Sequence, residues 1–249
     1  MSLKNEKIYL YGKNALREAL VARPKILKRV FLDKNAKADT ELLGLLSVNT
    51  VTVLDMKERA LRDVGASAVH QGVIAEISTE ALYTPLEEVL SSSNASPRQC
   101  FVLLDELQDP HNVGAIIRSA AAFGVDAVLL PEHNQAPITA VVIKTSAGMV
   151  FRIPIVKIGN VNQTLRLLKE KRFWVYGLAM GGDTMLHNAT FDTLVVFVIG
   201  NEGEGIREKT LELCDITLSI PMDPKCESLN ASVAASVVLY EYKTKTAGL

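Results

Sequence analysis

From residue 101 onward the sequence alternates between apolar runs and helical patterns, and this alternation most restricts what the chain can fold into. Six runs are rich in branched and aromatic apolar residues. Strands of that kind are buried on both faces, which is typical of a mostly parallel sheet covered by helices. The predicted strands are FVLLDEL, DAVLLP, FRIPIVKI, FWVYGLAM, LVVFVIG and ITLSIPM. We therefore predict an α/β fold for this part of the chain.

Helical patterns separate these strands. We expect helices at residues 112–124, ending at Gly124, at 138–148, ending at Gly148, at 160–172, capped by Asn160 or Asn162, at 207–214, and at 228–246. In an open parallel sheet, ligands bind beyond the carboxyl ends of the strands. The segments that follow strands are therefore the places to look for chemistry.

The first 78 residues contain shorter elements. NALREAL is helical, RVFLD, TVTVLD and GVIAEIS are extended, and KERALRDVG is helical with Gly65 as its stop. They predict a small αβ domain. The run SSSNASP, small polar residues closed by proline, is typical of a linker. We therefore predict one domain at residues 1–78, a linker at 79–98 and a second domain at 99–249.

Composition excludes several classes of protein. Of 249 residues, 48% are apolar and 22% charged, and no apolar run approaches the roughly 18 residues of a membrane span. The opening MSLKNEK lacks the apolar centre of a secretory signal, so a cytoplasmic location is expected. Cys100, Cys214 and Cys226 are odd in number and have no CxxC spacing, which argues against both disulfides and a zinc site.

Positive charge is concentrated near the start, although the net charge of the chain is −1. Between Lys13 and Lys34 there are seven basic residues against two acidic ones. Two interpretations stay open, an ordinary solvated surface or a patch that faces phosphates. The candidates for phosphate contact are Lys13, Arg17 and Arg29.

Two segments that follow strands have unusual polar residues. In DELQDPHNVGAIIRSAAAFG, Asn112 begins a helix in which Arg118 stands among Ile and Ala residues; the ordinary explanation is an arginine that reaches solvent or pairs with an acid. In VVFVIGNEGEGI, three glycines make a pliable turn that brings backbone N–H groups close to a ligand and presents Glu202. This turn matches neither GxGxxG nor a phosphate loop.

A third such segment is IPMDPKCESLNASVAASVVLYEY, in which Glu227, Ser228 and Asn230 crowd a helix start. A helix N-cap explains Ser228 but not its two polar neighbours. Ser228 does not have the setting of a hydrolase nucleophile, because GxSxG is absent and no histidine is placed by sequence as its base.

Together and in this order, NVGAIIRSAAAFG, VIGNEGEGI and IPMDPKCESLNASVAASVVLYE resemble the three motifs of the SpoU, or TrmH-like, family of RNA ribose 2′-O-methyltransferases. YGKNALREAL and HQGVIAEIS resemble the substrate-binding domain, similar to the ribosomal protein L30e fold, of the branch that methylates guanosine in 23S ribosomal RNA. The resemblance covers nearly the whole chain. It implies a deep trefoil knot in the second domain, a homodimer, S-adenosylmethionine as cofactor and no metal.

The resemblance also assigns roles to residues. It implies catalytic roles for Arg118, Asn112, Glu202, Ser228 and Asn230, with Ser228 holding the target phosphate. It makes Lys13, Arg17 and Arg29 candidates for RNA binding. It places the cofactor at Ala179, Met180, Gly181, Gly200, Asn201, Glu202, Gly203, Ile220, Met222, Ser228, Leu229 and Asn230.

The implied reaction is attack of a ribose 2′-oxygen on a sulfonium methyl group. The family mechanism proposes Arg118 as general base, but a guanidinium is permanently protonated in proteins. Our alternative hypothesis is that the Arg118 cation stabilises the alkoxide while a phosphate oxygen or water accepts the proton.

Other functions stay open. The RNA could be transfer RNA, the chain could be a non-catalytic RNA-binding or ribosome-assembly factor, or the substrate could be a small molecule. The sequence departs from the family pattern at Asp223 to Cys226, where a glycine is common, and at Ala231, where valine is more usual.

Overall fold

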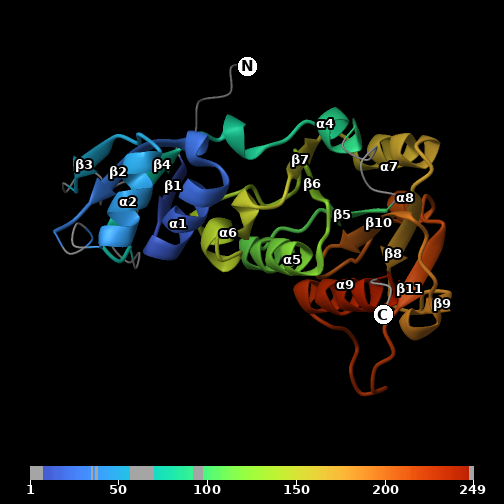
Figure 1. Ribbon diagram of the computed structural model, residues 1–249. Helices are drawn as coiled ribbons and strands as arrows, with labels where there is room; N and C mark the ends of the chain where they lie inside the picture. Colours follow the sequence, from blue (N-terminus) through green and yellow to red (C-terminus); the bar gives the residue numbers. More distant parts are fainter. Residues whose placement is uncertain (1–7, 35, 37–38, 57–69, 92–97, 247–249) are drawn as a thin grey trace. The chain divides into compact units, whose positions relative to one another are not determined.

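The computed structural model describes residues 8–34, 36, 39–56, 70–91 and 98–246 (Figure 1). The chain divides into two compact units. Unit 1 contains Met1–Tyr83 and Ile138–Arg152, and unit 2 contains Thr84–Pro137 and Ile153–Leu249. The helix predicted to stop at Gly65 and most of the run SSSNASP lie outside the described residues. The predicted domain boundary at residues 79–98 stays a prediction.

Unit 2 is built on a seven-stranded sheet in which every pairing is parallel, in the order β7-β6-β5-β10-β8-β11-β9. Its strands are β5 (Gln99–Asp105), β6 (Ala127–Pro131), β7 (Ile155–Ile158), β8 (Trp174–Leu178), β9 (Thr184–Met185), β10 (Leu194–Gly200) and β11 (Ile216–Ser219). All six predicted strands are confirmed. The two-residue β9 was not predicted, because so short a strand has no periodic pattern.

Unit 2 contains five α-helices and a short 3-10 helix among the described residues, and several of the α-helices have a side-chain cap at their start. They are α4 (Leu86–Ser91), α5 (Pro110–Phe123), α7 (Val161–Glu170), the short η6 (Leu186–Asn188), α8 (Glu208–Leu211) and α9 (Ala231–Thr246). The side chain of Asp109 accepts a hydrogen bond from the N–H of His111 at the start of α5, and Gly124 ends that helix at φ 75°. Asn160, not Asn162, caps α7.

The last helix returns from the margin of the sheet to its middle. Strand β11 is next to the edge, yet α9 packs on α5 and β10 near the centre. The hydroxyls of Ser119 and Ser236 are 2.8 Å apart, and the ring centroids of Phe197 and Tyr242 are 5.5 Å apart. These contacts hold α9 over the central strands.

Helix α9 begins at Ala231, later than predicted. The side-chain oxygen of Asn230 accepts hydrogen bonds from the N–H groups of Ser232, at 2.9 Å, and Val233, at 3.4 Å. Asn230 is therefore the N-cap, and the interpretation of Ser228 as the cap is wrong.

Unit 1 has a four-stranded sheet in the order β1-β4-β2-β3, antiparallel except for the β2–β3 pair. Its strands are β1 (Ile8–Tyr11), β2 (Leu27–Leu32), β3 (Val53–Asp55) and β4 (Val73–Ile77). Its helices are α1 (Lys13–Ala22), η1 (Pro24–Ile26), α2 (Thr40–Val48), η3 (Glu80–Leu82), α6 (Ala140–Thr145) and η5 (Met149–Phe151). The predicted strands and the NALREAL helix are confirmed; β1 and α2 are additions.

Residues 138–152 belong to unit 1 although they interrupt unit 2 in sequence. Helix α6 packs against β1, and the ammonium of Lys144 lies 5.9 Å from the centroid of the Tyr11 ring. The helix predicted to end at Gly148 ends at Thr145, and Gly148, at φ 81°, begins η5 instead. No helix within the described ranges is long and apolar enough to cross a membrane.

Candidate active site

The loops that follow β5 and β10 leave the sheet side by side. The two strands pair in parallel along their whole length, and Gly200 at the end of β10 is opposite Asp105 at the end of β5. Polar residues from both loops therefore meet at the carboxyl edge of the sheet, where ligands of such sheets bind.

Three residues far apart in sequence form one chain of hydrogen bonds at this edge, here called the Asn112 cluster (Asn112, Glu202 and Asn230). The Asn112 amide nitrogen donates to a carboxylate oxygen of Glu202 at 2.7 Å. The Asn230 amide nitrogen donates to the side-chain oxygen of Asn112 at 2.9 Å. Asn112 is 6% exposed, whereas Glu202 and Asn230 are exposed. The first turn of α5 is thereby joined to the β10 loop and to the start of α9.

Arg118 and Ser228 have free polar groups. Both side chains are exposed, Arg118 on α5 and Ser228 within the exposed segment 221–230. Neither has a hydrogen bond or an ion pair among the residues that the structure describes. The ordinary explanation that Arg118 reaches solvent fits this placement, and pairing with an acidic residue does not. Both groups are available to a ligand.

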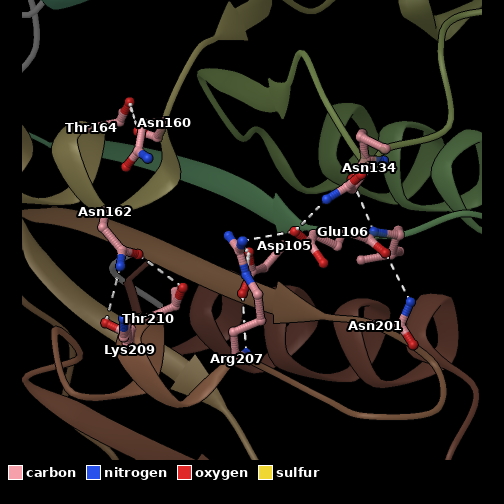
Figure 2. Close-up of polar contacts among 12 residues, drawn as sticks. Asp105, Glu106, Asn134, Asn160, Asn162, Thr164, Asn201, Arg207, Lys209 and Thr210 are labelled. Atoms are coloured by element: carbon pink, nitrogen blue, oxygen red, sulfur yellow. Dashed lines mark hydrogen bonds and ion pairs between the residues drawn. The ribbon is translucent and has the colours of Figure 1, made fainter.

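A second group of polar residues, the Arg207 cluster (Asp105, Glu106, Asn201 and Arg207), lies at the same edge (Figure 2). Asp105 is fully buried and accepts from the Arg207 guanidinium at 3.0 and 2.6 Å and from its backbone N–H at 3.2 Å. Another guanidinium nitrogen donates to Glu106 at 2.7 Å. The hydrogen bond to Asp105 is the main reason why the pKa of Arg207 is raised.

The Arg207 cluster also holds the backbone of two loops. Glu106 adopts φ 62°, and its backbone oxygen accepts from the side chain of Asn201 at 2.8 Å, while Asn134 donates to its carboxylate at 3.2 Å (Figure 2). From the sequence, Asp105 and Glu106 were predicted only as the end of a strand. The missed signal was an aspartate that closes a strand buried at every position.

The turn after β10 requires a glycine at its base. Asn201 and Gly205 exchange two backbone hydrogen bonds, at 2.9 and 3.0 Å. A Cβ on Gly200 would lie 2.2 Å from the carbonyl carbon of Gly205, which is closer than atoms can approach. The Asn201 side chain accepts from the N–H of Gly203 at 2.8 Å. The turn is thus closed by its own hydrogen bonds, and Glu202 within it is exposed.

The residues predicted to bind the cofactor all belong to unit 2 and follow β8, β10 and β11, which are neighbours in the sheet. Gly181 adopts φ 69°, and the N–H of Ala179 donates to the backbone oxygen of Leu218 at 3.1 Å. Met180 is 72% exposed, and Met222 and Leu229 are also exposed. This edge therefore offers both backbone groups and apolar side chains.

Two of the three predicted RNA-binding residues share a carboxylate in unit 1. The Lys13 ammonium is 3.1 Å from Asp39, and the Arg17 guanidinium is 3.2 Å from Asp39 and 2.9 Å from Glu41. The hydrogen bond from the Leu42 N–H, followed by that from Lys13, lowers the pKa of Asp39 below its ordinary value of 3.8.

The third, Arg29, donates to Glu76 at 2.7 and 3.0 Å across the β2–β4 pair. Glu76 is buried, so the guanidinium compensates a charge that has left water. All three basic side chains are therefore engaged within unit 1, and their contact with RNA stays a prediction.

The cysteines have no partner for metal binding in the described ranges, where no group of three His, Cys, Asp or Glu side chains is arranged to hold an ion. Burial raises the pKa of the Cys214 thiol to about 12, and it raises that of the buried Cys100 as well. Both thiols stay protonated at neutral pH.

Two family models match this chain. Residues 99–240 match the SpoU rRNA Methylase family, and residues 9–82 match the model for RNA 2'-O ribose methyltransferase substrate binding. The chain belongs to the SpoU rRNA methylase family. The resemblance carried by the three motifs is thereby confirmed, and the Asn112 cluster joins residues from all three.

Relatives within the SpoU family match over most of their length. The 23S rRNA (guanosine-2'-O-)-methyltransferase of Xanthomonas campestris is 37% identical over 97% of this chain and 97% of its own. The corresponding protein of Neisseria meningitidis is 34% identical over 93% of each chain. An uncharacterized tRNA/rRNA methyltransferase of Synechocystis is also 34% identical, and there the chain spans 61% of a longer protein.

Solved structures confirm the fold. The SpoU methyltransferase AviRb of Streptomyces viridochromogenes, in complex with the cofactor AdoMet, has a TM-score of 0.82 at 23% identity, covering 97% of this chain and 91% of its own. At this identity the comparison concerns the fold alone.

Proposed function

We propose that this protein transfers a methyl group from S-adenosylmethionine to the ribose 2′-hydroxyl of a guanosine in 23S ribosomal RNA. The observation that carries the proposal is the Asn112 cluster, which joins the three motif segments; two of these segments also carry Arg118 and Ser228, which are exposed and unpaired among the described residues. The names of relatives that match nearly end to end support this substrate. Such a substrate also supports a cytoplasmic location.

The residues at the carboxyl edge of β8, β10 and β11 fit S-adenosylmethionine. The left-handed Gly181, where a Cβ would have no neighbouring atom within 4 Å, allows a close backbone approach, and the exposed Met180, Met222 and Leu229 suit the apolar parts of a nucleoside thioether. When bound, this cofactor supplies an activated methyl group. The protein then has to orient the ribose and manage the proton of a weakly acidic hydroxyl.

Arg118 has the charge for the second task, and its exposed side chain is unpaired among the described residues. Its guanidinium stays protonated, so we assign it to stabilising the alkoxide that develops on the 2′-oxygen, with a phosphate oxygen or water as proton acceptor. Ser228 is exposed near the start of α9 and can donate to the phosphate of the target nucleotide. Asn112 is a positioning residue, because both ends of its amide are engaged by Glu202 and Asn230.

Two finer features belong to the same proposal. The return of α9 from the margin of the sheet to α5 supports the trefoil knot that the family resemblance implies.

Val233, Val237 and Tyr240 are exposed at helical spacing on α9 and form an apolar stripe, which supports a homodimer. Sedimentation of Val237→Glu tests the dimer: the variant should be monomeric, and a dimer of unchanged affinity would contradict this interface.

The experiment that tests the function is transfer of labelled methyl groups to total RNA from a strain that lacks this protein. Label should enter 23S ribosomal RNA at one guanosine, located by primer extension, and Arg118→Ala should transfer it about 10²- to 10³-fold more slowly. Label in transfer RNA would instead favour transfer RNA as the substrate. This second candidate function is supported by the name of the Synechocystis relative, a tRNA/rRNA methyltransferase. No label in any RNA, with cofactor binding seen by calorimetry, would favour a non-catalytic RNA-binding factor or a small-molecule substrate.

A further inference from the structure

Unit 1 contains a pocket of about 380 Å³ that none of the assignments above uses. It lies where η1 and the start of β2 meet the end of α2 and the turn that leads to β3. Lys25 and Lys28 contribute to its lining, together with residues 48–52. Strand β2, helix α2 and strand β3 are labelled in Figure 1. The pocket lies entirely within one unit.

The two lysines of this pocket differ from the three basic residues considered above. Both are exposed, and neither has a carboxylate partner among the residues that the structure describes. Lys13, Arg17 and Arg29, in contrast, all bind carboxylates. The positive charge of Lys25 and Lys28 is therefore free to bind an anion.

The lysines are also not needed to complete α2. A lysine near a helix C-terminus often binds the last backbone oxygens. Here the oxygen of Leu45 accepts from the side-chain nitrogen of Asn49 at 2.8 Å, and that of Ser47 accepts from the N–H of Thr50 at 3.2 Å. The chain itself thus satisfies the end of the helix.

The remaining lining combines hydroxyls with apolar groups. Thr50 and Thr52 provide the hydroxyls, and Pro24 and Val48 provide the apolar surface. Val48, the last residue of α2, is apolar and yet 83% exposed. Two ammonium groups beside hydroxyls and apolar surface match the phosphates, the ribose and the base of a nucleotide strand.

We propose that this pocket binds the sugar–phosphate backbone of the RNA substrate, with Lys25 and Lys28 each contacting a phosphate. The proposal rests on the proposed function, because it supplies the substrate contacts of that reaction. In this proposal the phosphates bind to two lysines that are unpaired among the described residues. Lys13, Arg17 and Arg29, which were the candidates from the sequence, are bound to carboxylates instead.

The test is the binding of transcribed 23S ribosomal RNA by Lys25→Gln/Lys28→Gln. Loss of two phosphate contacts should raise Kd about 10- to 100-fold at 0.1 M salt and reduce the slope of log K against log salt by about two. Lys25→Arg/Lys28→Arg should bind like the wild type. Lys171→Gln/Lys209→Gln is the matched control, since it removes two exposed lysines of unit 2.

The methyl-transfer readout separates failure of this inference from failure of the proposed function. The double variant should keep the wild-type Tm, its cofactor affinity and its kcat at saturating RNA, while KM for RNA rises. Unchanged Kd and salt slope would overturn the pocket even if methyl transfer is confirmed. Unchanged RNA binding with lost binding of poly-glutamate would assign the pocket to an acidic polypeptide and would also overturn it. A wild-type protein that labels no RNA would refute the proposed function instead.

Discussion

The Asn112 cluster and the Arg207 cluster lie at the same edge of one sheet, but they differ in burial and charge. In the Arg207 cluster a fully buried carboxylate, Asp105, is bound by a guanidinium and a backbone N–H. In the Asn112 cluster a neutral, buried amide connects two exposed side chains, Glu202 and Asn230.

This difference separates stability from function. A buried charge needs a compensating partner, so the buried Asp105 binds Arg207, and this pair serves to fix the two loops. The Asn112 cluster has exposed ends and lies in the segments that carry Arg118 and Ser228. Changes in the first cluster should lower the free energy of unfolding, and changes around the second should lower kcat.

The largest effect is expected for Arg118→Ala. Removing one group that stabilises a developing oxyanion costs about 2.7–4 kcal/mol, a loss of about 10²–10³ in kcat. Tm should not change, because Arg118 is exposed and has no partner among the described residues. Arg166→Ala, which removes an exposed arginine of α7, is the control for kcat and Tm.

Arg118→Lys distinguishes the two roles of this residue. Lysine deprotonates more readily than arginine, so a general base at this position would regain turnover at high pH. Substantial recovery in the pH–rate profile would contradict the purely electrostatic role.

Gly200→Ala should have the next largest effect. The new Cβ would lie 2.2 Å from the Gly205 backbone, so the turn that presents Glu202 must shift. We expect a loss of about 3 kcal/mol in the free energy of unfolding, measured in urea, together with reduced activity. Gly159→Ala is the control, because a Cβ at that position would have no neighbouring atom within 4 Å. A stable, active Gly200→Ala would show that the turn tolerates a different path.

Asp105→Asn tests the Arg207 cluster directly. It keeps the shape of the side chain but removes the charge that compensates Arg207. Because Arg207 is itself partly exposed, we expect a loss of about 1–3 kcal/mol rather than the full cost of a buried unpaired charge. Calorimetric Tm is the measurement. An unchanged Tm with a large loss of kcat would place Asp105 in the chemistry and remove the distinction between the two clusters.

Asn112→Ala should have a smaller effect. Its partners Glu202 and Asn230 are exposed and can bind water instead, so the stability loss should be about 1 kcal/mol. We expect kcat to fall about tenfold, since positioning of the motif segments is lost. Single-turnover kinetics with saturating RNA would measure it. A loss equal to that of Arg118→Ala would mean that Asn112 contacts the reacting groups itself.

The smallest effect concerns Asp39 in unit 1, whose pKa is lowered by the Leu42 N–H and by Lys13. A lowered pKa in the folded state gives stability that is fully present above the ordinary value of 3.8 and is lost as pH falls through the lower folded value. Asp39→Asn should therefore reduce Tm at pH 7 and differ less from the wild type at pH 3. Equal differences at both pH values would exclude this ionisation as the cause.

Much of the fold and of the candidate site could be predicted because the signals are local. Apolar runs between helical patterns predicted six of the seven strands of unit 2, and polar residues after those strands pointed to Asn112, Glu202 and Asn230. The capping residue of a helix was harder to predict. The polar residues at 227–230 indicated a helix start, but they did not show that the cap is Asn230 and not Ser228.

Which of these residues meet depends on the fold of the whole chain. The hydrogen bonds of Asn112 span 90 and 118 positions, and the pairing of Asp105 with Arg207 spans 102. The fold also determines which basic residues bind carboxylates. Lys13 and Arg29 do, whereas Lys25 and Lys28 stay unpaired among the described residues. Periodicity and turn residues act over a few positions, so the local sequence is enough to predict the elements and the types of their polar residues. Contacts across the chain depend on strand order and on the return of α9, which no local pattern specifies.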